Sequence, residues 1–194
     1  WISKDDKKIV NKALSQSMLT LGPQLEKFES DFCKYSNSKY AIAVSNCTAA
    51  LHLSLMALGI KKNDEVIIPD LTFVADANAI LACNAKPVIT DINKENFFLS
   101  ISNIKKNITK KTKAIIAVNL FGHPAQLHEL KKIAEDNDLV LIEDNAQAPL
   151  AREDGTYTGL IGDIGVFSLN YHKHMHTGEG GICTTNSDEL AFKI

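Results

Sequence analysis

The sequence predicts an α/β fold with a mostly parallel sheet covered by helices on both faces. Stretches with helical periodicity alternate with short β-rich stretches through almost the whole chain. The predicted strands are apolar throughout, which is typical of strands buried on both faces. No internal repeat, low-complexity segment or linker rich in Pro, Gly or Ser interrupts this alternation. Residues 1–194 are therefore predicted to form one α/β unit.

The first predicted elements are helices over residues 5–17 and 23–36, the second with Pro23 in its first turn. A short apolar strand over residues 40–44 follows. The polar residues Ser45, Asn46, Cys47 and Thr48 are cap candidates for the next helix, over residues 49–58, which Gly59 ends.

The later elements continue the same alternation. Strands are predicted over residues 65–68, 86–90, 113–118, 139–142, 165–169 and 181–184. Helices are predicted over about 73–84 and 125–137, in a polar connection before residue 113, and from Ser187 onward.

Composition excludes several classes of protein. The chain is 45% hydrophobic and 23% charged, as expected of a globular protein. Its formal net charge of -2 shows no excess of positive charge, which a nucleic-acid-binding protein usually has. No apolar run approaches the roughly 18 residues that span a bilayer, and the opening WISKDDKK is not a secretory leader. The four cysteines are widely spaced, which favours free thiols in the cytoplasm over a disulfide framework.

Polar clusters stand at the predicted carboxyl ends of three strands, where ligands gather in parallel sheets. Ser45 to Thr48 precede a helix and form either an anion site or simple caps. Asp144 stands just beyond four apolar residues, with Glu143 between, and needs a partner, which a salt bridge or a helix cap would also supply. Lys173 lies in GVFSLNYHKHMHTGEGG, five residues after Ser168. A lysine in a dry turn can attack a carbonyl, although a lone lysine is more often a surface residue.

Together, an anion site, a buried carboxylate and a lysine have one economical explanation. Pyridoxal phosphate needs a phosphate site, an acid that keeps its ring nitrogen protonated, and a lysine for covalent attachment. A metal site is the competing interpretation, because His172, His174 and His176 alternate and Cys183 follows. The neighbouring glycines favour a loop, so no metal is predicted.

Several segments, taken in order, resemble the nucleotide-sugar aminotransferase family of the DegT/DnrJ type. They are SNCTAALHLSLMALGIKKNDEVIIPDLTFVADANAI, KPVITDI, KTKAIIAVNLFGHPAQL, IEDNAQA, GDIGVFSL and KHMHTGEGG. The resemblance runs from about Gly22 to the last residue. It implies the three-layer α/β/α large domain of fold-type-I pyridoxal-phosphate enzymes, with a mostly parallel central sheet.

The resemblance also implies roles for individual residues. Lys173 would form the Schiff base with the cofactor and shuttle a proton, and Asp144 would pair with the pyridinium nitrogen. The other implied cofactor contacts are Gln147 at the ring hydroxyl, Phe73 stacked on the ring, and Ser168, Thr48 and the backbone of Cys47 at the phosphate.

The implied reaction moves an amino group from an amino acid, by family likeness L-glutamate, to the keto sugar of a nucleoside-diphosphate sugar, in a cytoplasmic homodimer. Two alternatives remain. A sister group of the family carries out sugar 3-deoxygenation with histidine in place of the Schiff-base lysine, whereas this chain has Lys173. The other alternative is an incomplete fragment that only dimerises or binds sugar nucleotide.

The chain departs from the family pattern at a few positions. Cys47 stands where glycine is usual, and its side chain could crowd the phosphate. Asn145 and Leu150 also replace the commoner alanine and glycine. Family members continue past the equivalent of Ile194, so residues 1–194 are predicted to be an incomplete large domain that lacks the small C-terminal domain.

Overall fold

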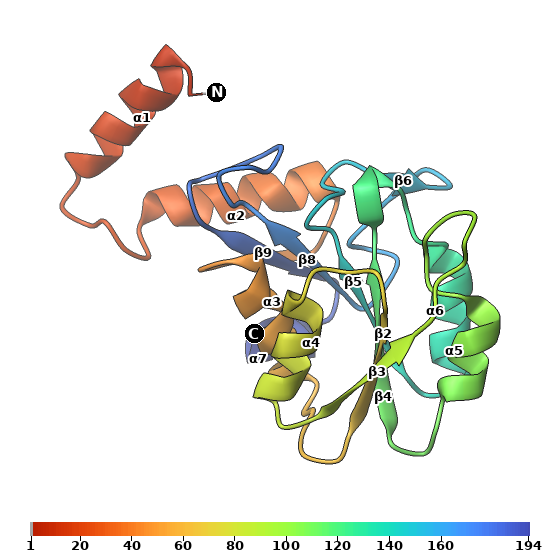
Figure 1. The fold of residues 1–194 in the computed structure, drawn as a ribbon. Helices are drawn as coiled ribbons and strands as arrows, with labels where there is room; N and C mark the ends of the chain where they lie inside the picture. Colours follow the sequence, from red (N-terminus) through yellow and green to blue (C-terminus); the bar gives the residue numbers. More distant parts are fainter. Residues whose placement is uncertain (1) are drawn as a thin grey trace.

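The structure, a computed structural model, describes residues 2–194 and is built on a seven-stranded sheet (Figure 1). The strand order is β1-β9-β8-β5-β4-β2-β3. Of these strands, β9 alone runs antiparallel to its neighbours β1 and β8, and the other pairings are parallel. The prediction of a mostly parallel α/β sheet is confirmed.

The element bounds follow the predicted alternation closely. The strands of the sheet are β1 (Tyr40–Val44), β2 (Glu65–Pro69), β3 (Lys86–Thr90), β4 (Thr112–Val118), β5 (Val140–Asp144), β8 (Ile164–Ser168) and β9 (Gly181–Thr185). The α-helices are α1 (Lys4–Leu14), α2 (Pro23–Ser36), α3 (Cys47–Ala57), α4 (Ala75–Ala82), α5 (Ile101–Asn107), α6 (Leu127–Asp136) and α7 (Asp188–Lys193).

Several features differ from the sequence-based expectation, and the first helix, predicted over residues 5–17, already ends at Leu14. Helix α3 begins two residues early, because Asn46 is its cap and accepts a hydrogen bond from the amide of Ala49 at 2.8 Å. A small hairpin, β6 (Arg152–Glu153) and β7 (Thr156–Tyr157), was not predicted, since strands of two residues carry no periodicity. A single 3-10 turn, η1 (Leu120–Gly122), also follows β4.

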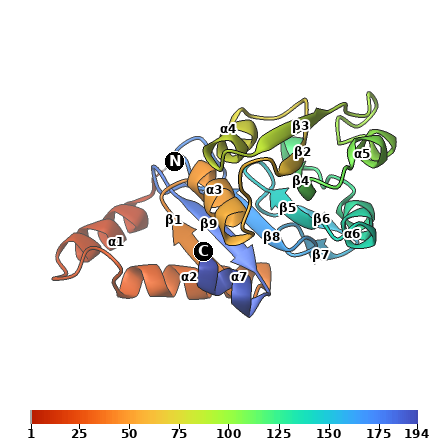
Figure 2. The ribbon, with the colours of Figure 1, turned by 90° about the horizontal axis from the view of Figure 1, so that it is seen from below.

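Helices cover both faces of the sheet, and the core is divided accordingly (Figure 2). Helices α3, α4 and α7 pack on one face, over side chains such as Val66, Ile116 and Ile142. Helices α5 and α6 cover the opposite face around Ile115 and Leu141. On that second face, α2 packs on β1, β8 and β9 through a separate aromatic cluster.

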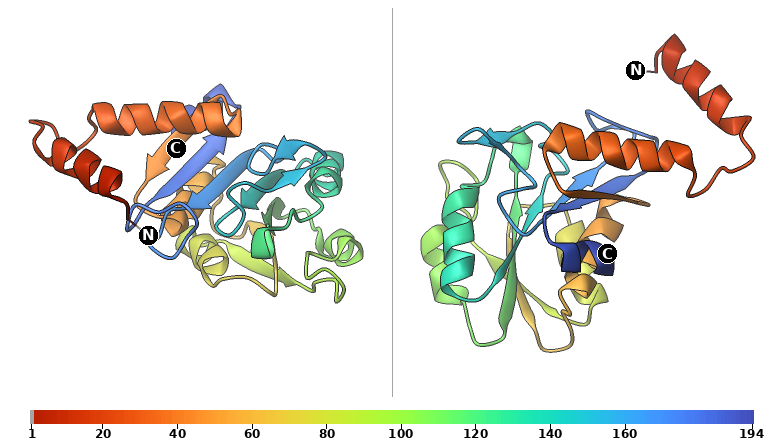
Figure 3. Two further views of the ribbon diagram at one scale, coloured as in Figure 1. Left: turned by 90° about the horizontal axis from the view of Figure 1, so that it is seen from above. Right: turned by 180° about the vertical axis from the view of Figure 1, so that it is seen from behind.

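Helix α1 projects beyond this body, as the right-hand view of Figure 3 shows. None of its residues is buried, although Ile9, Val10 and Leu14 are apolar and at least 55% exposed. Within residues 2–194, no helix combines the length and the apolar character that crossing a membrane requires.

Candidate active site

A pocket of about 570 Å³ lies at the carboxyl edge of the sheet, beside α3 and α4. Pockets for small ligands and cofactors commonly have a volume of roughly 300 to 1,000 Å³. All seven residues that the resemblance singles out line this pocket, namely Cys47, Thr48, Phe73, Asp144, Gln147, Ser168 and Lys173. The fold therefore brings together residues from widely separated parts of the sequence.

Asp144 is the last residue of β5 and is only 5% exposed. Its Oδ1 accepts a hydrogen bond from the amide of Ala146 at 2.8 Å and lies 3.9 Å from the Cys47 sulfur. Burial raises the pKa of Asp144, while the Ala146 hydrogen bond and the charge of Lys173 oppose that rise. A buried carboxylate with so few partners would be stabilised by a cation beside it.

The first turn of α3 faces the same pocket. The Asn46 side chain accepts a hydrogen bond from the backbone amide of Ala49. The first-turn amides of Cys47 and Thr48 have no acceptor inside the helix. These amides, the Thr48 hydroxyl and Ser168 make the pocket favourable for an anion. A Cβ on Gly181 would lie 2.5 Å from the backbone carbon of Asn46, so only glycine lets β9 pass this close to the helix start.

Cys47 is the first residue of α3, and its buried thiol lies 3.9 Å from the Asp144 Oδ1. Burial raises the pKa of Cys47 well above its usual value, and the nearby carboxyls raise it further. The Cys47 thiol is thus packed beside Asp144 while the residue also lines the pocket, and the crowding of a phosphate by its side chain stays a prediction.

Lys173 lies in the loop that joins β8 to β9. Two backbone hydrogen bonds close the loop at its base, from Leu169 to Gly180 at 2.8 Å and from Thr177 to Leu169 at 2.9 Å. A turn with a hydrogen bond from the Lys173 amide to the Asn170 carbonyl at 2.8 Å carries the half-buried lysine into the pocket. His172, His174 and His176 lie in this loop and not on a strand, so they do not share one side as metal ligands would on a strand.

Gln147 and Phe73 border the pocket on its other sides. The Gln147 Oε1 accepts a hydrogen bond from the amide of Phe121 at 2.8 Å, which leaves its side-chain amide group free to donate to a ligand. Phe73 is 73% exposed, as an aromatic ring without a stacking partner would be. The lining also includes Asn46 and His172, together with three polar residues to which sequence reasoning gave no role: Thr72, Asn170 and Glu179.

Glu143, the neighbour of Asp144 on β5, points away from the pocket and is fully buried. Its carboxyl oxygens accept hydrogen bonds from the backbone amides of Gly159 and Gly162, with N–O distances of 2.5 Å each. These bonds hold the loop before β8 in place. Burial raises the pKa of Glu143 to about 7, because it outweighs these hydrogen bonds.

Glu143 makes the stability of the fold depend on pH. Its pKa is raised from 4.5 to about 7 in the folded state, so the folded state binds more protons than the unfolded state in that range. Its contribution is complete below pH 4.5 and is lost as pH rises through 7, by an amount on the order of 3 kcal/mol. Urea denaturation of Glu143→Gln should show a flatter decline of unfolding free energy over this range than the wild type. The exposed Glu95→Gln should retain the wild-type slope, and an equal slope in Glu143→Gln would contradict the assignment.

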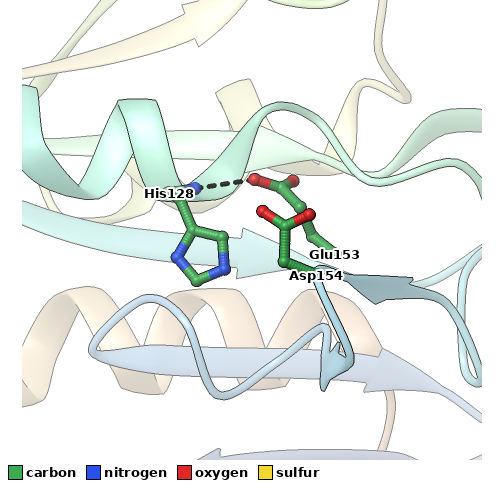
Figure 4. Close-up of side chains that lie close together, drawn as sticks. All are labelled: His128, Glu153 and Asp154. Carbon is green, nitrogen blue, oxygen red and sulfur yellow. Dashed lines mark hydrogen bonds between the residues drawn. The ribbon is translucent and has the colours of Figure 1, made fainter.

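A second group of titratable side chains lies on the rim of the hairpin, where His128, Glu153 and Asp154 approach one another (Figure 4). Their candidate ligand atoms lie within 4.8 Å of one another. Both Glu153 carboxyl oxygens, however, accept hydrogen bonds from backbone amides at the start of α6, from Leu127 at 2.8 Å and from His128 at 2.9 Å. Glu153 thus caps the start of α6, where Gln126 has a left-handed backbone conformation and gives no side-chain cap. The partial positive charge at the start of a helix disfavours a cation there.

Comparison with known proteins identifies relatives along the whole chain. The sequence profile of the DegT/DnrJ/EryC1/StrS aminotransferase family matches residues 1–194. The GDP-perosamine synthase of Escherichia coli O157:H7 is 42% identical over 95% of this chain and 51% of its own length.

Solved structures agree with this match. The aminotransferase from Psychrobacter cryohalolentis superimposes with a TM-score of 0.96 at 36% identity, over 100% of this chain and 50% of its own. NtdA from Bacillus subtilis, with bound cofactor PMP, gives 0.88 at 34% identity, over 99% of this chain and 44% of its own. These matches confirm the predicted fold class. The chain spans about half the length of the curated relatives it matches.

Proposed function

Because this chain belongs to the DegT/DnrJ/EryC1/StrS aminotransferase family, we propose that its protein is a pyridoxal-phosphate-dependent sugar aminotransferase. It moves an amino group from an amino acid, L-glutamate by family likeness, to the keto sugar of a nucleoside-diphosphate sugar. The observation that carries the proposal is the meeting of Lys173 and Asp144 in one pocket, with an anion-binding helix start beside them. GDP-perosamine synthases among the relatives support a nucleotide-sugar substrate.

The residues of the pocket fit pyridoxal phosphate on three counts. Asp144 is a buried carboxyl without a lysine or arginine hydrogen-bonded to it in the described chain, so a protonated ring nitrogen would offset its burial. The first turn of α3, with Thr48 and Ser168, would accept the phosphate. Lys173 would hold the aldehyde carbon through its amine.

The cofactor, when bound, supplies an electron-accepting ring that stabilises negative charge on the substrate carbon. Asp144 would hold the positive charge on the ring nitrogen, and Phe73 would cover one face of the ring. Gln147 would donate a hydrogen bond to the ring hydroxyl. Lys173, once its amine is free, would move the proton between the substrate carbon and the cofactor carbon.

We also propose a cytoplasmic homodimer. The apolar side chains that α1 and the following segment leave exposed, among them Leu14, Leu19 and Leu21, support association with a second copy. The free thiols of Cys33, Cys47, Cys83 and Cys183 fit a reducing compartment.

The proposed reaction is tested by incubating the intact protein with pyridoxal phosphate, L-glutamate and a panel of keto sugar nucleotides that includes GDP-linked sugars. Release of 2-oxoglutarate should require a keto sugar nucleotide and should continue beyond a single turnover. A nucleoside diphosphate without the sugar is the matched control. Release that stops after one equivalent with every sugar in the panel would contradict the assigned acceptor.

A further inference from the structure

A buried pair of asparagine side chains joins the carboxyl ends of β4 and β5. Asn119 directly follows β4, Asn145 directly follows β5, and each is at most 1% exposed. The Asn119 Nδ2 donates a hydrogen bond to the Asn145 Oδ1 at 2.7 Å, and the Asn145 Nδ2 donates to the Glu143 carbonyl at 3.1 Å. Neither asparagine lines the pocket, although the residues directly before and after each one do: Val118, Leu120, Asp144 and Ala146.

The backbone around Asn119 completes the connection. Its Oδ1 accepts a hydrogen bond from the Ala125 amide at 2.8 Å, which closes the base of the segment 119–125. Its own amide donates to the Asp144 carbonyl at 3.0 Å. A buried amide group is costly unless it is paired, so the two asparagine side chains depend on each other. The Asn119–Asn145 pair therefore ties the turn after Asp144 to the segment 119–125.

The same segment contacts the turn at a second point. The Phe121 amide donates a hydrogen bond to the Gln147 Oε1 at 2.8 Å. Phe121 has a left-handed backbone conformation, with φ of 57°, which side chains other than glycine rarely adopt. Its side chain is 75% exposed, so burial does not stabilise this conformation. Hydrogen bonds at Asn119 and at Gln147 instead hold the segment.

We propose that Asn119 and Asn145 act together as positioning residues of the cofactor site. The pair sets the separation between the Asp144 carboxyl and the Gln147 side chain. The inference rests on the proposed function, in which these two groups bind the ring nitrogen and the ring hydroxyl. Both positions belong to one rigid ring, so their partners must be held at a matching separation. Asn119 contacts the Asp144 end of the turn directly and the Gln147 end through Phe121.

The connection is tested first in the intact protein without cofactor, by hydrogen exchange. Asn145→Ala removes the acceptor of the Asn119 side chain and leaves Asn119 in place. The Phe121 and Ala125 amides should then exchange about tenfold faster, because the segment opens more easily. The Leu141 amide, within β5, should keep its wild-type protection. Wild-type exchange at Phe121 and Ala125, or an equal acceleration at Leu141, would overturn the proposal.

The effect on the cofactor site is tested by comparing pyridoxal phosphate with its analogue that has carbon in place of the ring nitrogen. Asn145→Ala should weaken binding of pyridoxal phosphate by about tenfold, and binding of the analogue by no more than about threefold. The analogue has no ring nitrogen to pair with Asp144, so a displaced carboxyl costs it less. Equal losses for the two ligands would overturn the positioning role, since a general loss of stability does not distinguish between them.

Asn107→Ala is the matched control for these measurements. It removes another asparagine hydrogen bond, from the Asn107 Nδ2 to the Thr90 hydroxyl at 3.0 Å, and Asn107 does not line the pocket. Both affinities should stay at the wild-type values, and a tenfold loss of pyridoxal phosphate here would count against the specific role of the Asn119–Asn145 pair.

Asn119→Ala breaks the pair from its other side and covers the case in which Asn145→Ala does not fold. It should reproduce the difference between the two ligands. The double variant should lose no more affinity than the weaker-binding single variant, because both substitutions remove the same interaction. Additive losses would show that the two asparagines act separately and would overturn the pair. If the wild type binds no pyridoxal phosphate, the proposed function fails, and the exchange measurement still decides whether the pair holds the segment 119–125.

Discussion

Lys173→Ala is expected to abolish covalent capture of pyridoxal phosphate and to lower turnover by about 10³- to 10⁴-fold. The lysine is the one amine that lines the pocket among residues 2–194, so its loss removes both the covalent link and the group proposed to move the proton. The measurement is borohydride reduction of the protein with cofactor, followed by peptide mass spectrometry and a transamination assay. The reduced cofactor should be found on the peptide that contains Lys173.

Lys105→Ala is a suitable control, because this lysine is exposed on α5, away from the pocket. It should retain wild-type labelling and turnover. Loss of Lys173 should also raise the pKa of Asp144 further, since the lysine charge is one of the influences that lower it. Labelling of Lys173→Ala at wild-type stoichiometry would assign the covalent link to another residue.

Asp144→Ala should lower turnover by roughly 10²- to 10³-fold while leaving part of the cofactor affinity intact. The variant removes the negative charge that would hold the ring nitrogen protonated, but it leaves the helix start, Thr48 and Ser168 for the phosphate. Stopped-flow measurement of the glutamate half-reaction separates slow proton removal from weak binding. Asp144→Asn should be similarly slow, because the amide keeps the size of the side chain without its charge.

Asp136→Asn supplies the comparison, since Asp136 is an exposed acid at the end of α6. It should not alter the half-reaction. If Asp144→Ala reacted with glutamate at the wild-type rate, the ring nitrogen would have to be paired with another group.

Local chemistry explains which elements the sequence could predict. Helix α2 has the predicted bounds because Pro23 opens it and Asn37 closes it in the left-handed conformation, with φ of 62°. The start of α3 was misplaced because Ser45, Asn46 and Thr48 are all chemically able to cap, and only the structure shows that Asn46 does so. Apolar strands were recognisable individually, but a strand that is apolar on both faces does not indicate its neighbours.

The candidate site divides in the same way. Lys173 and Asp144 were recognisable because a lysine in a glycine-rich loop and an acid at a strand end are unusual, and the family likeness added the remaining pocket residues. The burial of Asp76 was not recognisable, because an acid in the first turn of a helix is an ordinary pattern and its packing in the fold is not local.

The single antiparallel strand has a consequence for how the polypeptide folds during synthesis. Strand β1 has β9 as its one sheet neighbour, with Tyr40 opposite Thr185 and Val44 opposite Gly181. During synthesis, β1 therefore leaves the ribosome long before its partner β9 is made. The backbone hydrogen-bonding groups of β1 stay unpaired until the other strands of the sheet have been synthesised. Nascent chains that end before β9 are expected to be protease-sensitive around residues 40–44 and to bind chaperones there.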